Sequence, residues 1–164
     1  IERAVFVPRF IEIIRSLDST TGSNRFIGLA AAGTGGLDTS GDQAIQLVGA
    51  PGSFDLTTIS SGLAEALNSL SLRSESFVTT TKEKTLSETL AVVAEQITKS
   101  PGIAILATTP AVEDLAAAVA IGRLTTHSVI VVSAGETRLS ALSEIVREFE
   151  VSGIDCDGVL IISN

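Results

Sequence analysis

Short apolar runs alternate along the chain with segments whose apolar positions recur every three or four residues. The runs predict buried strands at 44–50, 75–79, 103–107, 128–133 and 159–162. The periodic segments predict helices at 57–70, from 86 to about 99, up to about 124, and at 139–149. Because strands and helices alternate at short spacing, we predict an α/β fold, a three-layer α/β/α doubly wound and mainly parallel sheet.

Residues 1–43 are predicted to precede the main domain, which spans 44–164, the two together forming one compact domain. Apolar positions at helical spacing predict a helix from about Arg9. The apolar stretch 26–32 predicts a strand, and 33–43 is a glycine-rich loop.

Composition narrows the class of protein. The 164 residues suffice for one substantial core, and at 45% hydrophobic but 4% aromatic that core must consist of aliphatic side chains. The net charge of −8 argues against a nucleic-acid partner. A single cysteine excludes an internal disulfide and fits a reducing compartment, and no apolar run approaches the ~20 residues of a membrane span. The chain starts at Ile1 and has no Met, so we expect a piece of a longer protein.

The stretch 44–70 has the layout of a phosphate-binding P-loop: a strand, a Gly/Pro turn and a helix. GAPGSFDL stands in the place of G-x-x-x-x-G-K-[ST]. Gly49 holds the first glycine position, whereas Phe54, Asp55 and Leu56 replace the second glycine, the lysine and the hydroxyl residue. A charge-assisted hydrogen bond from lysine contributes roughly 1.5–3 kcal/mol, and here a repulsive carboxylate replaces it. The sequence therefore predicts a P-loop fold that has lost its phosphate chemistry.

Three segments carry a resemblance to a known family: LVGAPGSFDLTTISSGLAEAL, GIAILATTPAVEDLAAAVAIGRLTTHSVIVVSAGETR and GVLIISN. Their order resembles the bacterial tyrosine kinases of capsule and exopolysaccharide synthesis and, more broadly, the ParA/MinD-type P-loop ATPases. The likeness covers 44–164 and implies a P-loop NTPase-like fold.

The same resemblance implies acidic metal ligands that this chain lacks. The family's Walker B carboxylate would end the strand at Ala107, and a second acidic strand end would stand at Thr79. Because phosphoryl transfer depends on metal and cationic groups, the missing lysine, hydroxyl and two acids predict a catalytically dead domain. The family also phosphorylates its own tail tyrosines, and this chain contains no tyrosine.

Five positions would meet a nucleotide if the site were vestigial: Gly49, Gly52, Thr57, Thr58 and Asn164. Asn164 stands where the family has an asparagine that contacts the base, and it can equally cap the strand. Thr57 can cap the helix. We assign no catalytic residue and no metal ligand, and we expect neither ATP nor Mg²⁺ as a cofactor.

The favoured hypothesis is a non-catalytic P-loop-like regulatory or interaction domain of an exopolysaccharide or lipopolysaccharide biosynthesis protein. We expect a cytoplasmic location, either alone or as the cytoplasmic domain of a membrane protein. The partner would be a second copy or a polysaccharide-export membrane protein. The alternative is a kinase-like or ATPase-like enzyme with a site relocated to Thr57, Thr58 or the glycine loop 33–41. A third hypothesis is a small-molecule sensor at the carboxyl ends of the strands.

Two other residues have candidate chemistry. His127 is the only histidine. It can be a general base, but a loop or helix-end histidine is the simpler interpretation. Cys156 lies between two aspartates, so we expect no activated thiolate.

Overall fold

The computed structural model describes residues 10–15, 43–51, 55–69, 73–79, 85–99, 102–108 and 115–163. Its strands are β1 Phe10–Arg15, β2 Gln43–Gly49, β3 Ser74–Thr79, β4 Ile103–Thr108, β5 His127–Ser133 and β6 Gly158–Ser163. Its helices are α2 Leu56–Ser69, α3 Leu86–Lys99, α4 Leu115–Gly122 and α5 Leu139–Val151.

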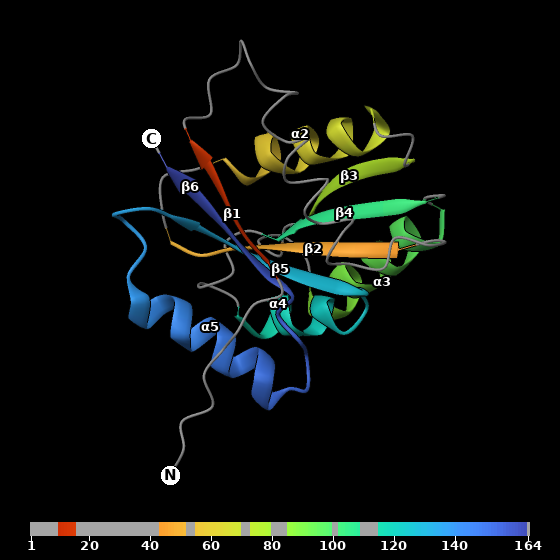
Figure 1. The fold of residues 1–164 in the computed structure, drawn as a ribbon. Helices are drawn as coiled ribbons and strands as arrows, with labels where there is room; N and C mark the ends of the chain where they lie inside the picture. Colours follow the sequence, from red (N-terminus) through yellow and green to blue (C-terminus); the bar gives the residue numbers. More distant parts are fainter. Residues whose placement is uncertain are drawn as a thin grey trace.

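The six strands form one sheet in the order β1-β6-β5-β2-β4-β3, and every described pairing is parallel. Helix α2 covers one face, while α3, α4 and α5 lie on the other (Figure 1). Parallel strands need such crossover helices, which bury both faces of the sheet. The predicted α/β/α class is therefore confirmed, and the strands and helices predicted from residue 44 onward have bounds within one or two residues of those observed.

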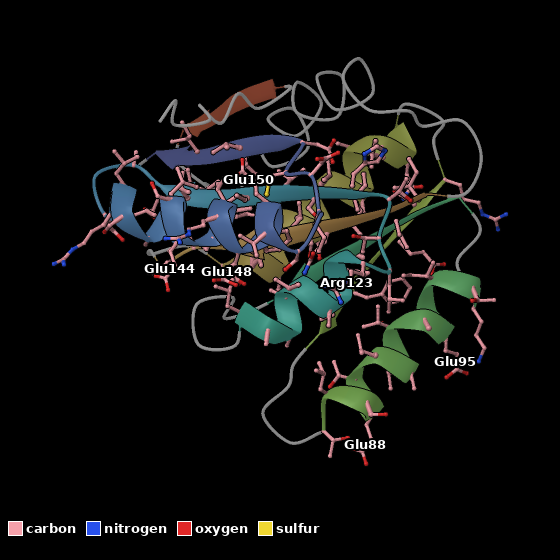
Figure 2. The ribbon with its side chains drawn as sticks, turned by 90° about the horizontal axis from the view of Figure 1, so that it is seen from below. Glu88, Glu95, Arg123, Glu144, Glu148 and Glu150 are labelled. Atoms are coloured by element: carbon pink, nitrogen blue, oxygen red, sulfur yellow. The ribbon has the colours of Figure 1, made fainter. Side chains whose placement is uncertain are left out.

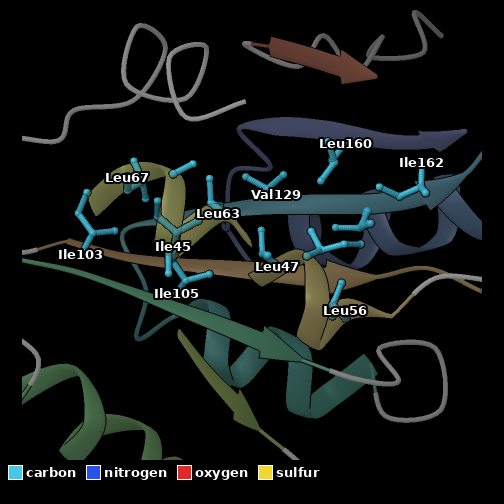
Figure 3. Packing of buried hydrophobic residues seen from close by; sticks show 14 residues of the cluster. Ile45, Leu47, Leu56, Leu63, Leu67, Ile103, Ile105, Val129, Leu160 and Ile162 are labelled. Atoms are coloured by element: carbon cyan, nitrogen blue, oxygen red, sulfur yellow. The ribbon is translucent and has the colours of Figure 1, made fainter. Parts of the chain in front are cut away.

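Successive side chains of a strand alternate between two apolar cores. Ile45 and Leu47 of β2 face α2, whereas Val48 packs with α5 on the opposite side. Figure 3 shows the α2-side core, which comprises Ile45, Leu47, Leu56, Ile59, Leu63, Ala64, Ala66, Leu67, Ile103, Ile105, Val129, Val131, Leu160 and Ile162. Strand β5 is buried along its whole length, and its central residues 129–132 form a continuous apolar run.

Helix α5 is held to the sheet by an apolar stripe. Ile145, Val146 and Phe149 are buried at helical spacing, and Phe149 is fully inaccessible. The helix ends where Gly153 adopts a positive φ of 75°, and the next amide, that of Ile154, donates to the Phe149 carbonyl at 2.8 Å. The chain leaves this turn toward β6, so the start of that strand lies close to the end of α5.

A buried polar side chain connects β2 to α4. Gln46 is inaccessible to solvent, and its Nε2 donates to the carbonyl oxygen of Ala118 at 3.0 Å. Gly122, the last residue of α4, leaves space for this amide: an added Cβ would lie 3.1 Å from Gln46 Oε1. The bond from Gln46 thus fixes the short helix against the central strand, and the missing side chain of Gly122 leaves room for the buried amide.

The first strand overturns one prediction. Residues Phe10–Arg15 form β1, so the helix predicted from about Arg9 is wrong for these residues. β1 pairs with β6 in parallel register, from Phe10↔Gly158 to Arg15↔Ser163. A short apolar run fits both the helical and the strand period, and here the pairing provides partners for the otherwise open edge of β6. The predicted strand 26–32 and residues 33–42 of the glycine-rich loop lie outside the described residues, whereas Gln43, assigned to that loop, begins β2.

Candidate functional site

We call residues 49–56, which stand in the place of the P-loop pattern, the P-loop counterpart. It follows the carboxyl end of β2. This strand ends at Gly49, and α2 begins at Leu56, so the predicted strand-to-helix connection is confirmed. β2 lies between β4 and β5, and the Ala50 amide donates to the Val131 carbonyl of β5 at 2.9 Å. Carboxyl ends of central parallel strands are the usual ligand position in open α/β sheets.

Asp55 caps the first turn of α2. Its Oδ1 accepts a hydrogen bond from the Thr57 amide at 3.0 Å, and its Oδ2 accepts one from Thr58 Oγ1 at 2.9 Å. Its own carbonyl accepts the first helical bond, from Ile59 at 3.1 Å. This is the pattern of an N-cap aspartate. The predicted capping role of Thr57 is therefore wrong, because Thr57 lies inside the turn that Asp55 caps.

The cap also determines the charge state of the site. The Thr58 hydroxyl is the main group that holds the pKa of the Asp55 carboxyl below its usual value, and bonds from the Thr57 and Thr58 amides add to it. Slight desolvation acts in the opposite direction. The carboxylate is therefore ionised at neutral pH and stays next to the helix N-terminus, where a negative charge is favoured.

The turn after β5 lies at the same end of the sheet, beside the carboxyl ends of the central strands. Thr137 Oγ1 accepts from the Ser133 amide at 2.8 Å and donates to the Pro51 carbonyl at 2.7 Å. Gly135 forms the tip of this turn with a φ of 78°. Glu136, which stands where the resembling family has lysine, is exposed. The hydroxyl of Thr137 thus holds the turn and the P-loop counterpart together.

The structure describes three of the predicted nucleotide positions. Gly49 ends β2, and Thr57 and Thr58 lie in the first turn of α2, where both are bonded to the Asp55 carboxylate. Gly52 and Asn164 lie outside the described residues.

The backbone of β4 lies directly beside the P-loop strand. Ala107 is in register with Leu47, and Thr108 is in register with Val48. The strand that would carry the Walker B acid therefore takes its expected place, with alanine at the predicted acidic position.

The described residues contain no group of three His, Cys, Asp or Glu side chains that could hold a metal ion. Among the helices that the structure describes, none is long and apolar enough to cross a membrane.

His127 occupies an unexpected position. It begins β5 and is only 9% exposed, so the interpretation as a loop or helix-end histidine is wrong. Its Nδ1 lies 3.3 Å from Asp157 Oδ2, which also accepts a bond from the Ser128 amide at 3.2 Å. Thirty residues separate His127 from Asp157, and no local sequence pattern joins them.

Cys156 lies beside this pair. Burial is the main reason that the pKa of its thiol rises to about 12, and the neighbouring carboxylates of Asp157, Glu150 and Asp155 raise it further. The expectation that Cys156 is not an activated thiolate agrees with this environment.

Comparison with solved structures identifies the fold. The chimerical protein CapA2B2 superposes with a TM-score of 0.71 at 16% identity, covering 93% of this chain and 93% of that one. The kinase domain of the Escherichia coli tyrosine kinase ETK gives 0.66 at 12% identity over 86% of this chain and 75% of its own. The fold is that of the bacterial tyrosine kinase domains. The BceF tyrosine kinase domain also has this fold, with a TM-score of 0.66 at 13% identity, covering 86% of this chain and 77% of its own.

The resemblance to the bacterial tyrosine kinases and the predicted P-loop-like architecture are thus confirmed at the level of fold. No protein-family model and no curated protein sequence matches the chain. Within this tyrosine kinase fold, Asp55 stands at the position that the P-loop pattern assigns to lysine, and its carboxylate is bonded to the helix start.

Proposed function

We propose that this chain is a non-catalytic, P-loop-like regulatory or interaction domain of an exopolysaccharide or lipopolysaccharide biosynthesis protein. The shared fold with the ETK and BceF tyrosine kinase domains supports the biosynthetic setting. One observation carries the non-catalytic part: the Asp55 carboxylate binds the Thr57 amide and the Thr58 hydroxyl at the helix start. A carboxylate of the chain itself therefore occupies the helix start, where a P-loop would bind phosphate.

A comparison of the attraction by the helix N-terminus with the repulsion by Asp55 favours exclusion of a nucleotide. A helix N-terminus stabilises an anion by about 0.3–1 kcal/mol. Two like unit charges about 4 Å apart repel by about 1 kcal/mol in bulk water and about 4 kcal/mol near a protein surface. A triphosphate beside Asp55 would carry several such charges, so the repulsion exceeds the attraction of the helix. We accordingly propose that the domain uses neither ATP nor Mg²⁺.

The alternative, a nucleotide-binding enzyme with a relocated site, would need the hydroxyls of Thr57 and Thr58 for a metal ion or phosphate. The Thr58 hydroxyl already donates to Asp55, and the Thr57 hydroxyl also contributes to holding that carboxylate ionised. The Thr58 hydroxyl thus serves the cap, which favours the non-catalytic role.

The proposed setting is cytoplasmic, as a free domain or as the cytoplasmic part of a membrane protein. Its partner would be a second copy or a polysaccharide-export membrane protein. Figure 2 shows Glu144 and Glu148 along α5 and Glu88 and Glu95 along α3, and all four side chains are exposed. Together with the net charge of −8, these acidic surfaces argue against a nucleic-acid partner.

Calorimetric titration with ATP and Mg²⁺ tests the non-catalytic part. We expect no saturable heat for the wild type, with the ETK kinase domain as the positive control. Asp55→Asn keeps an oxygen acceptor for the cap but removes the charge, so it should bind inorganic triphosphate more tightly than the wild type does. Saturable ATP binding by the wild type that Thr58→Val abolishes would establish the relocated enzyme instead.

A genetic experiment tests the biosynthetic role. Deletion of the protein in its source organism should lower the amount of exported polysaccharide. Because the proposed role needs no phosphoryl transfer, a Thr58→Val copy should restore export as fully as the wild type. Unchanged export after deletion would contradict the biosynthetic setting. Failure of a Thr58→Val protein that is folded and as abundant as the wild type would contradict the non-catalytic role.

A further inference from the structure

Strand β3 forms one margin of the sheet (Figure 1). It is the last strand in the order β1-β6-β5-β2-β4-β3, and among the described residues only β4 pairs with it. An edge strand has a row of backbone N–H and C=O groups on its outer side, and these groups can pair with another chain. The register with β4 determines which residues of β3 supply them.

Successive residues of β3 direct their backbone groups alternately toward β4 and away from it. The Ile103 amide of β4 donates to the carbonyl oxygen of Arg73, just before β3, at 2.8 Å. Because the direction alternates from one residue to the next, Ser74, Ser76 and Val78 direct their N–H and C=O groups outward. These three residues therefore form the outer edge.

The first of these outward positions is already paired with a side chain. Asn68 Oδ1 accepts a hydrogen bond from the Ser74 amide at 2.9 Å, and its Nδ2 donates to the Ser74 carbonyl at 3.2 Å. The side-chain amide thus bonds both outward groups of Ser74, as a neighbouring strand would. The backbone of Ser76 has no such outer partner in the part of the chain that the structure describes. The open part of the edge therefore begins at Ser76.

A cavity of about 350 Å³ lies beside this edge, between β3 and α3. Its lining comprises Glu75 and Phe77 of β3 and Val92, Glu95, Gln96 and Lys99 of α3. Ser74 Oγ donates to the Ala64 carbonyl of α2, so Ser74 and Ser76 direct their side chains to the α2 face, and Glu75 and Phe77 to the α3 face. An extended segment paired with Ser76 would also direct alternate side chains to the α3 face, next to the cavity.

The lining combines apolar surface with a net negative charge. Phe77 and Val92 supply the apolar atoms. Glu95 and Lys99 form an ion pair with each other, so their charges balance. Glu75 is exposed and forms no ion pair with any residue that the structure describes. A lysine or arginine side chain matches this lining, because its methylene groups cover apolar surface while its charged end binds a carboxylate.

We propose that the open edge of β3 binds an extended, basic segment of a partner protein by strand addition. The segment pairs with the outward backbone groups from Ser76 onward, and a lysine or arginine side chain enters the cavity toward Glu75. A second copy of the chain fits less well, because each copy has a net charge of −8 and brings the same Glu75 to the contact. The proposal rests on the interaction role proposed above, but not on the state of the P-loop counterpart.

Amide hydrogen exchange distinguishes strand addition from other modes of binding. The probe is a capped heptapeptide in which lysine alternates with valine. We expect it to slow exchange of the Ser76 amide saturably and at least tenfold, whereas the Phe77 amide, which faces β4, should change little. The same peptide with N-methylated amides cannot pair and should have no effect. A peptide with glutamate in place of lysine should bind at least tenfold more weakly.

Three outcomes would overturn the proposal. The first is no saturable slowing at Ser76 with the lysine peptide, and the second is an equal effect of the glutamate peptide. The third is slowing at Ser76 that rises with protein concentration in the absence of peptide, because a second copy would then occupy the edge. Failure of the peptide to bind would leave the export assay, which tests the biosynthetic role, unaffected.

Variants separate the backbone contribution from the charge. Ser76→Pro removes an outward N–H but no bond to β4, and proline is tolerated on edge strands, so this variant should fold but lose binding of the lysine peptide. Glu75→Gln keeps the size of the side chain without its charge and should weaken binding at least fivefold. Glu144→Gln removes an exposed glutamate of α5 that does not line the cavity, so it should bind like the wild type. Unchanged affinity in Ser76→Pro or Glu75→Gln would contradict the corresponding contact.

Discussion

The hydroxyl of Thr137 lies 2.7 Å from the carbonyl oxygen of Pro51, although 86 residues separate them in the sequence. The same hydroxyl accepts a bond from the Ser133 amide at 2.8 Å. One side chain therefore fixes the turn after β5 and the loop after β2 together. This part of the P-loop counterpart is held by its neighbour in the sheet and needs no bound phosphate to define its position.

Replacement of Thr137 by valine should show how much these two hydrogen bonds stabilise the folded protein. Valine has the same shape but no hydroxyl, so both bonds are lost, and we expect the free energy of unfolding to fall by about 1 kcal/mol. Thr137→Ser keeps the hydroxyl and should lose much less. Urea denaturation of the three proteins measures the difference. Equal losses for valine and serine would show that the methyl group, and not the hydrogen bonds, is responsible.

Asp55→Ala should destabilise the fold by about 0.5–2 kcal/mol, because the first turn of α2 loses its cap. Asp55→Asn should cost less, since asparagine caps nearly as well. The free energy of unfolding at neutral pH, from guanidinium denaturation, gives both values. A loss for asparagine as large as that for alanine would contradict the capping role, because only the charge would then matter.

The stabilisation by Asp55 should also depend on pH. Hydrogen bonds, first that from the Thr58 hydroxyl, lower the pKa of this carboxyl in the folded state. A group whose pKa is lowered on folding contributes fully above its unfolded pKa, and the contribution is lost as the pH falls through the folded pKa. The difference in unfolding free energy between the wild type and Asp55→Asn should therefore shrink on acidification below pH ~4. A constant difference across this range would contradict the shift.

Gly102→Ala should be among the most disruptive changes in the described residues. Gly102 has a φ of 92°, and an added Cβ would overlap the Arg73 carbonyl oxygen, which accepts the Ile103 amide at 2.8 Å. Gly135→Ala is the matched control, since its φ is 78° but no atom lies within 4 Å of the added Cβ. We expect about 1 kcal/mol for Gly135→Ala from backbone strain. Gly102→Ala should cost a further ~1–3 kcal/mol from overpacking. Thermal denaturation distinguishes the two, and equal costs would contradict the overlap.

Cys156 should react slowly with iodoacetamide in the native state. Burial and nearby carboxylates raise the pKa of its thiol to about 12 from an ordinary 9.0. At pH 8 the native protein therefore has far less thiolate than the unfolded protein. The pH midpoint of alkylation, followed by mass spectrometry, should lie near 12 in the folded state and near 9 in urea. A native midpoint near 9 would contradict the burial of the thiol.

The sequence pattern was sufficient for the central strands and their helices. Residues 129–132 of β5 form a continuous apolar run, and the strand predicted at 128–133 differs from the observed β5 by one residue. β1 was not recoverable, because its six residues fit two periods and only the distant strand β6 decides between them. Long-range pairing is the information that a local pattern lacks.

The candidate site also contains one feature that the sequence predicts and one that it does not. The loss of the P-loop lysine at Asp55 is evident from the sequence, and aspartate directly before a helix is a recognised capping signal that could have revealed its role. The contact between His127 and Asp157 has no such signal, because residues from two strand ends meet only after the sheet forms.

The pairing of β1 with β6 also has a consequence for biosynthesis of the domain. Almost the whole described chain lies between these partners, and a ribosome that adds ~5–20 residues per second needs on the order of ten seconds to make it. During that time β1 is without its partner strand, while the segments for β2, β4 and β5 have already emerged. The sheet is therefore completed last at one edge, and a nascent chain stopped before residue 158 would expose the outer edge of β5 to other unfolded chains.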